Sequence, residues 1–186
     1  MPEPRISVII PAHNEAKAIG LVLAEIPKGL AHEVIVVDNN STDDTGRIAR
    51  AGGATVLREP RPGYGYACLA GMAHAFGGDK SEWPDLVVFL DGDHSDFPEQ
   101  MPELLAPLLR GEADLVIGSR ALGVREKGSL LPQQRFGNWL AARLGLRTVE
   151  VPVRYRKRIG TSKVSGTVRG TLGAGYKILW TIFKYW

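Results

Sequence analysis

The sequence alternates between short apolar runs and amphipathic helical patterns, and this alternation limits the fold more than any other feature. Each run is rich in Val, Ile or Leu and is followed by a polar or glycine-containing loop and then by a helical pattern or a further loop. Such alternation is typical of right-handed βαβ crossovers. We therefore predict an α/β fold with a Rossmann-like, mainly parallel sheet and helices on both faces. The expected strands are Arg5–Pro11, Glu33–Val37, Ala54–Leu57, Leu86–Leu90 and Asp114–Ile117.

The stretch Asp85–Gln100, DLVVFLDGDHSDFPEQ, is the centre of this pattern. Its apolar run predicts a strand buried on both faces, and the run stops at Asp91, Asp93 and Asp96. The carboxyl ends of parallel strands are where open α/β sheets bind ligands. Crowded carboxylates favour a cation between them, and Mg²⁺ takes one or two carboxylates together with substrate phosphate. Asp91 and Asp93 are therefore candidate ligands of a metal-bridged nucleotide diphosphate.

A plainer interpretation of the same stretch stays open. The carboxylates would then belong to a solvated turn before a helix that begins near Pro98, with Glu99 in its first turn. We expect Asp96 to be the N-cap of that helix under either interpretation. The other loops at this edge decide between the two, because Asp38 and Arg120 follow other predicted strands and would converge on Asp91 and Asp93.

Two glycine patterns bear on the type of ligand. Gly63-Tyr64-Gly65 precedes a predicted helix, where the missing side chains would let the backbone approach a ligand closely. The chain has neither the G-x-G-x-x-G fingerprint of dinucleotide binding nor the G-x-x-x-x-G-K-[ST] phosphate loop. A nicotinamide cofactor is therefore not expected.

Length and charge indicate one domain with two unlike halves. At 186 residues the chain can bury a core of its own. Residues 1–119 carry 9 Lys and Arg against 18 Asp and Glu, whereas residues 120–186 carry 14 against 2. An acidic half that suits a cation is thus followed by a basic half that suits anions. Nothing resembles a nucleic-acid recognition element, so we predict no nucleic-acid partner.

The basic half contains two segments that each allow two interpretations. Five cations within Arg154–Lys163 form either a solvated face or, with Gly160 and Ser162 among them, a loop that holds phosphate. The apolar, aromatic stretch 164–186 is either a helix packed on the sheet or a helix lying in a membrane interface. Between Arg120 and these segments, we expect a helix over Pro132–Leu144 and a strand over Thr148–Tyr155.

The single cysteine and the N-terminus bear on the compartment. Cys68 excludes a disulfide within the chain and is expected in the core, which favours a reducing compartment. The N-terminus leads directly into a strand, so no signal peptide is predicted. No apolar run has the length of a spanning helix. We expect a cytoplasmic protein with a peripheral contact at the cytoplasmic membrane face.

Five ordered motifs resemble the family 2 inverting glycosyltransferases of GT-A fold, and the branch they look most like transfers sugars to dolichol or polyprenyl phosphate. The motifs span nearly the whole chain: SVIIPAHNE, VIVVDNNSTDDT, FLDGDHSDFPE, VIGSR and RIGTSK. The resemblance implies a GT-A fold with a basic, apolar C-terminal extension, a UDP- or GDP-sugar donor, and Mg²⁺ or Mn²⁺. It also implies a nucleotide-sugar half over 1–119, and an acceptor and diphosphate half over 120–186. The sequence does not indicate the sugar or the oligomeric state.

Carried over by position, the motifs imply three sets of site residues. The metal set is Asp93 and Asp91 with Ser95. The catalytic set is Asp93, Arg158 and Lys163, the last two contacting the diphosphate or the acceptor phosphate. Asp38-Asn39-Asn40 stands where the family commonly has Asp-Asp-Gly-Ser, which leaves the base preference open. The donor-binding set is Pro11, Ala12, Asn14, Glu15, Asp38, Gly65, Asp91, Arg120 and Ser162.

One departure from the family pattern affects the acceptor. Members of this type usually carry several tens of residues, including part of the acceptor site, between the helix that ends at Leu144 and the strand that begins at Thr148. Here Leu144 joins Gly145 directly. Either the printed sequence omits residues of a longer chain, or the protein has a true deletion that would remove acceptor binding.

The resemblance implies metal-dependent, inverting transfer of a sugar to polyprenyl or dolichyl phosphate. A hydroxyl acceptor needs a general base, whereas a lipid phosphate is already ionised, and no carboxylate in the sequence is a convincing base. Three alternatives stay open: a glycosyltransferase acting on a saccharide hydroxyl, a nucleotidyltransferase, and an inactive, membrane-associated module that binds sugar nucleotides.

Overall fold

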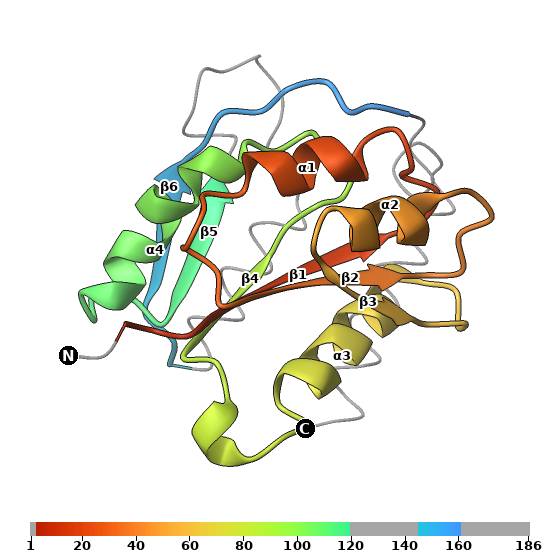
Figure 1. The fold of residues 1–186 in the computed structure, drawn as a ribbon. Coiled ribbons are helices and arrows are strands. Elements are labelled where there is room, and N and C mark those ends of the chain that lie inside the picture. The colour runs from red at the N-terminus through yellow and green to blue at the C-terminus, as the bar shows by residue number, and fades with distance from the viewer. Residues whose placement is uncertain (1–2, 120–144, 161–186) are drawn as a thin grey trace.

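The computed structural model describes residues 3–119 and 145–160, and its ordered elements follow the predicted alternation (Figure 1). The expected positions of Arg120, Ser162 and Lys163, the helix 132–144 and the interfacial stretch 164–186 lie outside these residues. In chain order the elements are β1 Ile6–Ala12, α1 Ile19–Glu25, β2 Glu33–Asp38, α2 Thr45–Ala51, β3 Thr55–Arg58, α3 Tyr64–Ala75, the 3₁₀ turn η1 Lys80–Glu82, β4 Leu86–Phe89, the 3₁₀ turn η2 Pro98–Gln100, α4 Met101–Leu109, β5 Leu115–Ser119 and β6 Thr148–Pro152.

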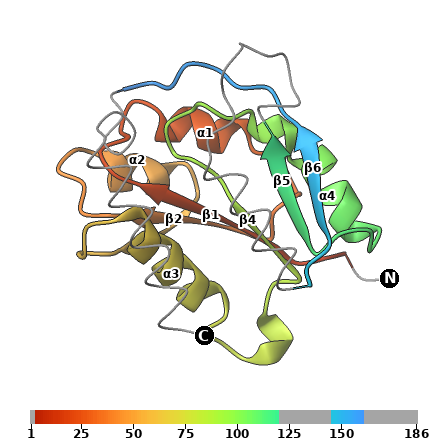
Figure 2. The same cartoon turned by 180° about the vertical axis from the view of Figure 1, so that it is seen from behind.

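The main sheet has the strand order β3-β2-β1-β4, and all of its strand pairs are parallel. Alternate residues of β1 pack on opposite faces of this sheet. Val8 and Ile10 pack with α1, α2 and α4, whereas Ile9 packs with Ala67 of α3. Figures 1 and 2 show α3 on one face and α1, α2 and α4 on the other. The predicted mainly parallel α/β sandwich is confirmed.

The strands β5 and β6 form a separate parallel pair beside α4. A salt bridge and hydrogen bonds join Arg147 to Asp114 at the start of this pair. After β6 the chain continues as an extended segment that runs past α1 (Figure 1). No helix in the described part of the chain is long and apolar enough to cross a membrane.

Three local predictions need correction. The strand at Leu86 is not buried on both faces: it ends at Phe89, which is 47% exposed, because β4 pairs only with β1 among the described strands. Asp96 is not the helix cap, since Phe97 precedes the turn that opens at Pro98 and no side chain caps it. Cys68 is half-buried on α3 rather than in the core.

Candidate functional site

Loops after β1, β2 and β4 meet at the carboxyl edge of the main sheet. In the ladder between β1 and β2, Ala12 lies opposite Asp38. Gly92 lies against the end of β1, because a Cβ there would be 3.4 Å from the Pro11 carbonyl oxygen and 3.5 Å from the Ala12 Cβ. The Asp91–Asp93 loop therefore lies beside the end of β1, whose other neighbour is β2, so the three loops share one edge as the parallel crossovers predict.

Hydrogen bonds join the loop after β1 to the loop after β2. The Asn14 N–H donates to Ser41 Oγ at 2.9 Å, and Asn14 Oδ1 accepts from the Thr42 N–H at 2.7 Å. The Glu15 N–H donates to Thr45 Oγ1 at 2.8 Å. Asn14 and Glu15 thus hold the two loops in one arrangement through their backbone and amide groups.

Asn39 fixes a third loop, the one after β3. Its side chain is buried, and its amide donates to the carbonyl oxygens of Glu59 at 3.0 Å and Arg61 at 2.7 Å. Its amide oxygen accepts from the Gly63 N–H at 2.7 Å. Each polar atom of this side chain therefore has a partner within the protein, which makes Asn39 a structural residue of the carboxyl edge of the sheet.

Backbone strain gathers at the same edge. Asn14, Asn40 and His94 have positive φ angles of 55°, 62° and 61°, and they are the non-glycine residues of the described chain with this conformation. Each follows a different strand of the main sheet. Non-glycine residues persist in this region when the surrounding contacts determine them, and they cluster at functional sites.

Asp93 is buried and is held through both of its carboxylate oxygens. Its residue is 6% exposed, one carboxylate oxygen accepts from the Ser95 N–H at 2.9 Å, and the other is 3.0 Å from Arg158 Nη2. Its backbone oxygen accepts from the Ile159 N–H at 2.9 Å. The predicted catalytic pair of Asp93 and Arg158 is thus brought together.

The extended segment after β6, residues 153–160, will be called the basic arm. Within it the Arg154 N–H donates to Gln100 Oε1 at 2.8 Å and the Arg156 N–H to the Ser95 carbonyl oxygen at 2.9 Å. Arg154 and Arg156 both lie over the Phe97 ring, with guanidinium carbons 4.5 and 4.4 Å from its centroid. The basic arm therefore runs beside the loop Asp91–Phe97, which will be called the acidic loop, from Phe97 back to Asp93.

Burial and the charges of the site together shift the pKa values of three side chains. Partial burial lowers the pKa of Arg158, but Asp93 and, more weakly, Asp91 raise it, and the net shift is upward. A hydrogen bond from Arg156 lowers the pKa of Glu25 despite its partial desolvation. Although Tyr64 is 54% exposed overall, desolvation around its hydroxyl and the nearby Asp91 carboxylate raise the pKa of that phenol.

The oxygens after β4 fit a hard divalent cation. Ser95 Oγ is fully buried and has no hydrogen-bond partner, directly beside Asp93. Residues 3–119 and 145–160 hold no group of three His, Cys, Asp or Glu side chains that would form a complete metal cage. Two carboxylates and a hydroxyl suit an ion that takes its remaining ligands from substrate phosphate and water, as Mg²⁺ does.

Most of the predicted site residues lie in the described part of the chain; Arg120, Ser162 and Lys163 do not. Gly65 lies in the first turn of α3, next to Tyr64, whose pKa the Asp91 carboxylate helps to raise. Sequence reasoning missed Asn39, Glu25 and Arg156 as structural contributors to the edge. Arg156 belongs to a run of cations, but no local pattern distinguishes it from its neighbours.

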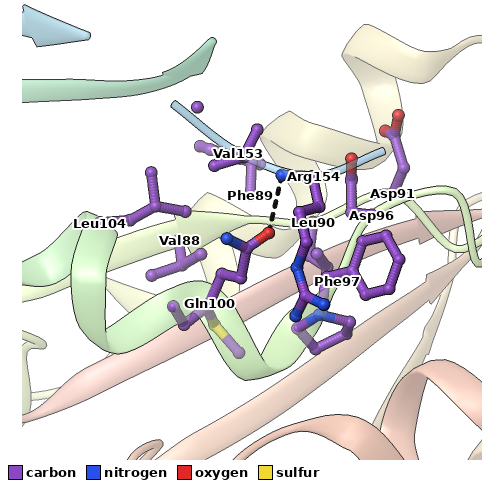
Figure 3. Close-up of a pocket in the computed structure, with 13 residues that line it drawn as sticks. Val88, Phe89, Leu90, Asp91, Asp96, Phe97, Gln100, Leu104, Val153 and Arg154 are labelled. Carbon is purple, nitrogen blue, oxygen red and sulfur yellow. Dashed lines mark hydrogen bonds between the residues drawn. The ribbon is translucent and has the colours of Figure 1, made fainter. Parts of the chain in front are cut away.

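A cavity of about 210 Å³ lies between β4, α4 and the start of the basic arm (Figure 3). Asp91 and Asp96 stand at one end, and Gln100 holds the Arg154 N–H at its side. Its walls are otherwise mostly apolar, with Val88, Phe89, Leu104 and Val153 among them. An apolar cavity of this size does not suit a nucleotide, so the candidate donor site is the open edge beside it.

Comparison with known proteins identifies the family of the chain. The family model described as Glycosyl transferase family 2 matches residues 7–182. An uncharacterized glycosyltransferase of Mycobacterium tuberculosis is 34% identical over 214 aligned positions, which cover 90% of this chain and 93% of that protein. An undecaprenyl-phosphate mannosyltransferase of Micrococcus luteus is 30% identical over 224 positions, covering 89% and 90%.

A solved structure shares the fold. Glucosyl-3-phosphoglycerate synthase from Mycobacterium tuberculosis, in complex with Mn²⁺, UDP and glucosyl-3-phosphoglycerate, aligns with a TM-score of 0.66 and 25% identity over 92% of this chain and 75% of that chain. This confirms the GT-A type of architecture. With its parallel sheet, its Asp-Gly-Asp loop and a family match over nearly its whole length, the chain belongs to glycosyl transferase family 2.

Proposed function

We propose that this glycosyltransferase moves a sugar from a UDP- or GDP-sugar to a polyprenyl phosphate with inversion at the sugar carbon. The observation that supports the donor site best is the contact of the acidic loop with the basic arm, 3.0 Å between Asp93 Oδ2 and Arg158 Nη2. An acidic loop can hold a metal–diphosphate, and an adjacent guanidinium can bind its phosphate oxygens.

Each group of the edge has a role in this proposal. Pro11, Ala12, Glu15 and Asp38 hold the base and ribose, the role that the family resemblance implies, and Ala12 lies opposite Asp38 at the end of the two neighbouring strands. Asp91 and Asp93 bind the metal, with Ser95 Oγ as a further oxygen ligand. A bound Mg²⁺ or Mn²⁺ would offset the charge that develops on the leaving diphosphate. Arg158 stabilises the same charge from the basic arm.

Two findings support a divalent ion and a nucleotide in this site. The glucosyl-3-phosphoglycerate synthase of M. tuberculosis has been solved with Mn²⁺ and UDP, and also with Mg²⁺ and UDP. The buried, unpartnered Ser95 Oγ beside Asp93 is an independent sign from this chain. We therefore propose Mg²⁺ or Mn²⁺ as the cofactor ion.

The acceptor proposal rests on the M. luteus relative and on charge. That undecaprenyl-phosphate mannosyltransferase matches over 90% of its own length. A lipid phosphate needs no general base, since it is already ionised at neutral pH, and the cations of the basic arm suit it. In this proposal the stretch 164–186 contacts the membrane interface, and the protein lies at the cytoplasmic membrane face.

A soluble hydroxyl acceptor is the second candidate. The M. tuberculosis synthase was solved with its product glucosyl-3-phosphoglycerate, so an enzyme of this fold also acts on a small phosphorylated acid. Such an acceptor would use the same phosphate-binding cations, but it would need a base near its hydroxyl.

The length of the relatives bears on the acceptor as well. About 167 residues of this chain, 90% of 186, occupy 214 aligned positions, so about 47 positions of the M. tuberculosis relative's alignment have no residue here. We propose that these positions fall between Leu144 and Gly145, where the sequence departs from the family pattern. If the deletion is real, the chain binds a sugar nucleotide without turnover.

The test is a transfer assay with radiolabelled UDP-glucose or GDP-mannose, each with and without Mn²⁺. Undecaprenyl phosphate in micelles and 3-phosphoglycerate in solution serve as separate acceptors. We expect label in the organic phase with undecaprenyl phosphate only. Label in the aqueous product with 3-phosphoglycerate would replace the lipid acceptor by the second candidate. Thermal stabilisation by nucleotide and Mn²⁺ without any transfer would identify a binding module.

Two carboxylate-to-amide variants test the metal assignment. Asp93→Asn should abolish Mn²⁺-dependent transfer, whereas Glu103→Gln, an exposed site on α4, should leave it unchanged. Full metal-dependent turnover by folded Asp93→Asn protein would refute the role given to Asp93.

A further inference from the structure

Arg156 joins parts of the chain that are far apart in sequence. Its guanidinium pairs with the Glu25 carboxylate at the end of α1, through Nη1 to Oε1 at 3.2 Å and through Nη2 to Oε2. Its Nε donates to the His94 carbonyl oxygen at 2.7 Å, and its Nη2 donates to the Asp96 carbonyl oxygen at 3.0 Å. This side chain therefore binds both an element of the scaffold and the acidic loop.

The two carbonyl groups that Arg156 holds lie on either side of Ser95. His94, which follows Asp93, has the strained φ angle of 61°, and its Nε2 lies 2.9 Å from Glu25 Oε1. A strained residue keeps its conformation only when its contacts determine it. Glu25 and Arg156 supply these contacts of His94, so their ion pair supports the course of the loop that carries Asp93 and Ser95, together with the backbone hydrogen bonds of that loop.

The basic arm is held along the acidic loop by side-chain and backbone contacts. Along the extended arm, Arg156 and Arg158 face the acidic loop and are partly buried, whereas Lys157 between them is exposed. The backbone N–H groups of Arg156 and Ile159 donate to the Ser95 and Asp93 carbonyl oxygens, each at 2.9 Å. Arg156 thus contacts the acidic loop through both its backbone and its side chain, two residues before Arg158 reaches Asp93.

We propose that Arg156 is a positioning residue for the donor site, and that its ion pair with Glu25 holds the acidic loop in its metal-binding shape. This inference rests on the proposed function, because it takes Asp93 as a metal ligand. Arg156 itself need not touch the donor: its donor groups are directed to Glu25 and to the two loop carbonyls, a fork geometry that lysine lacks.

The sign of the effect on metal affinity separates positioning from plain electrostatics. Removal of a cation near a metal site should strengthen Mn²⁺ binding if only charge matters. Positioning predicts the opposite, because a loosened loop must be ordered again when the ion binds. We expect Arg156→Ala to weaken Mn²⁺ binding about tenfold, the loss of hydrogen bonds to a charged group being worth about that factor. Lys157→Ala, which removes one cation from the exposed side of the same arm, should bind Mn²⁺ as tightly as the wild type or more tightly.

The experiment uses the full chain and two readouts. Mn²⁺ affinity, without nucleotide, is measured by electron paramagnetic resonance. Hydrogen exchange at the Ser95 and Ile159 amides reports the loop and the arm directly. Glu25→Gln, a milder change, and Arg156→Lys, which keeps the charge, should both show part of the loss, and they replace Arg156→Ala if that variant does not fold.

Weaker Mn²⁺ binding together with faster exchange in Arg156→Ala, but not in Lys157→Ala, supports the proposal. Unchanged or tighter Mn²⁺ binding by Arg156→Ala overturns it, as does weaker binding with unchanged exchange. If the wild type binds no Mn²⁺, the proposed metal site fails on its own. The hydrogen-exchange rates then decide on the positioning role. Faster exchange in Arg156→Ala but not in Lys157→Ala supports it, and rates equal to those of the wild type refute it.

Discussion

Replacement of Asn39 by aspartate changes the side-chain amide into a carboxylate at the carboxyl edge of the main sheet. The amide donates two hydrogen bonds, to the Glu59 and Arg61 carbonyl oxygens at 3.0 and 2.7 Å, and a carboxylate can donate neither. The bond accepted from the Gly63 N–H would survive. The new negative charge would face two carbonyl oxygens in a residue that is 7% exposed.

The magnitude follows from these contacts. Two lost hydrogen bonds cost about 2 kcal/mol together, and a buried carboxylate with a single donor costs several kcal/mol before relaxation. We expect Asn39→Asp to lower the free energy of unfolding by about 3–5 kcal/mol at pH 7. Asn39→Ala, which adds no charge, should lower it by about 2–3 kcal/mol.

Acidification gives the variant a distinctive signature. Burial would raise the pKa of the introduced aspartate carboxyl above its ordinary value of about 3.9. The protonated form can donate one hydrogen bond, so the destabilisation is complete above the raised pKa and shrinks as the pH falls through it. Urea unfolding of the wild type and both variants at pH 5 and pH 8 measures this difference.

A stability of Asn39→Asp within about 1 kcal/mol of the wild type at pH 8 would refute the reasoning, as would an equal loss at both pH values. The variant also bears on the family pattern, in which aspartate is common at this position. A large loss would mean that the loop after β3 in this chain is specific for an amide.

Three further predictions concern other parts of the fold. Gly71→Ala should destabilise the protein by about 1–3 kcal/mol in urea unfolding, because its Cβ would lie 2.5 Å from Ile9 Cγ2 in the core. Hydrogen bonds from Arg147 lower the pKa of Asp114 to about 2. The stability difference between the wild type and Asp114→Asn should therefore be constant above about pH 5 and shrink as the pH falls to and below about 2. Desolvation raises the pKa of the Cys68 thiol to about 11, so iodoacetamide should alkylate it at pH 8 about a hundredfold more slowly than a free thiol. An alkylation rate equal to that of an unfolded control would show that this thiol is not protected.

The strands and the meeting of their loops could be predicted because their signals are local. An apolar run such as Glu33–Val37 specifies a strand by itself, and the observed β2, Glu33–Asp38, differs by one residue. The crossover rule then places Asp38 and Asp91 at one edge without any knowledge of side-chain contacts.

The contacts that fix the site could not be predicted in the same way. Glu25 and Arg156 are 131 residues apart, and neither stands in a pattern that distinguishes it from other surface charges. The exposure of Phe89 depends on the neighbours of β4. The sequence cannot show these neighbours, since an apolar run looks alike in a central strand and in an edge strand. Aspartate is a residue type that often caps helices, but in the structure the N-cap position before Pro98 is taken by Phe97 and not by Asp96.

The separation in sequence between the acidic loop and the basic arm has a consequence for how the protein folds. β1, β2 and β3 pair with neighbours a few tens of residues away, whereas Asp93 reaches its partners at Arg158 and Ile159 only after a much longer loop has closed. Contacts across long loops form late, since their closure entropy must be overcome first. We expect β1, β2 and β3 to pair before the donor site forms in refolding; β4 pairs with β1 across a longer stretch still, from Ile6 to Leu86, and is not part of this prediction. Protection of the β1 and β2 amides should therefore precede nucleotide binding in a pulsed hydrogen-exchange experiment, and simultaneous appearance of the two would contradict this order.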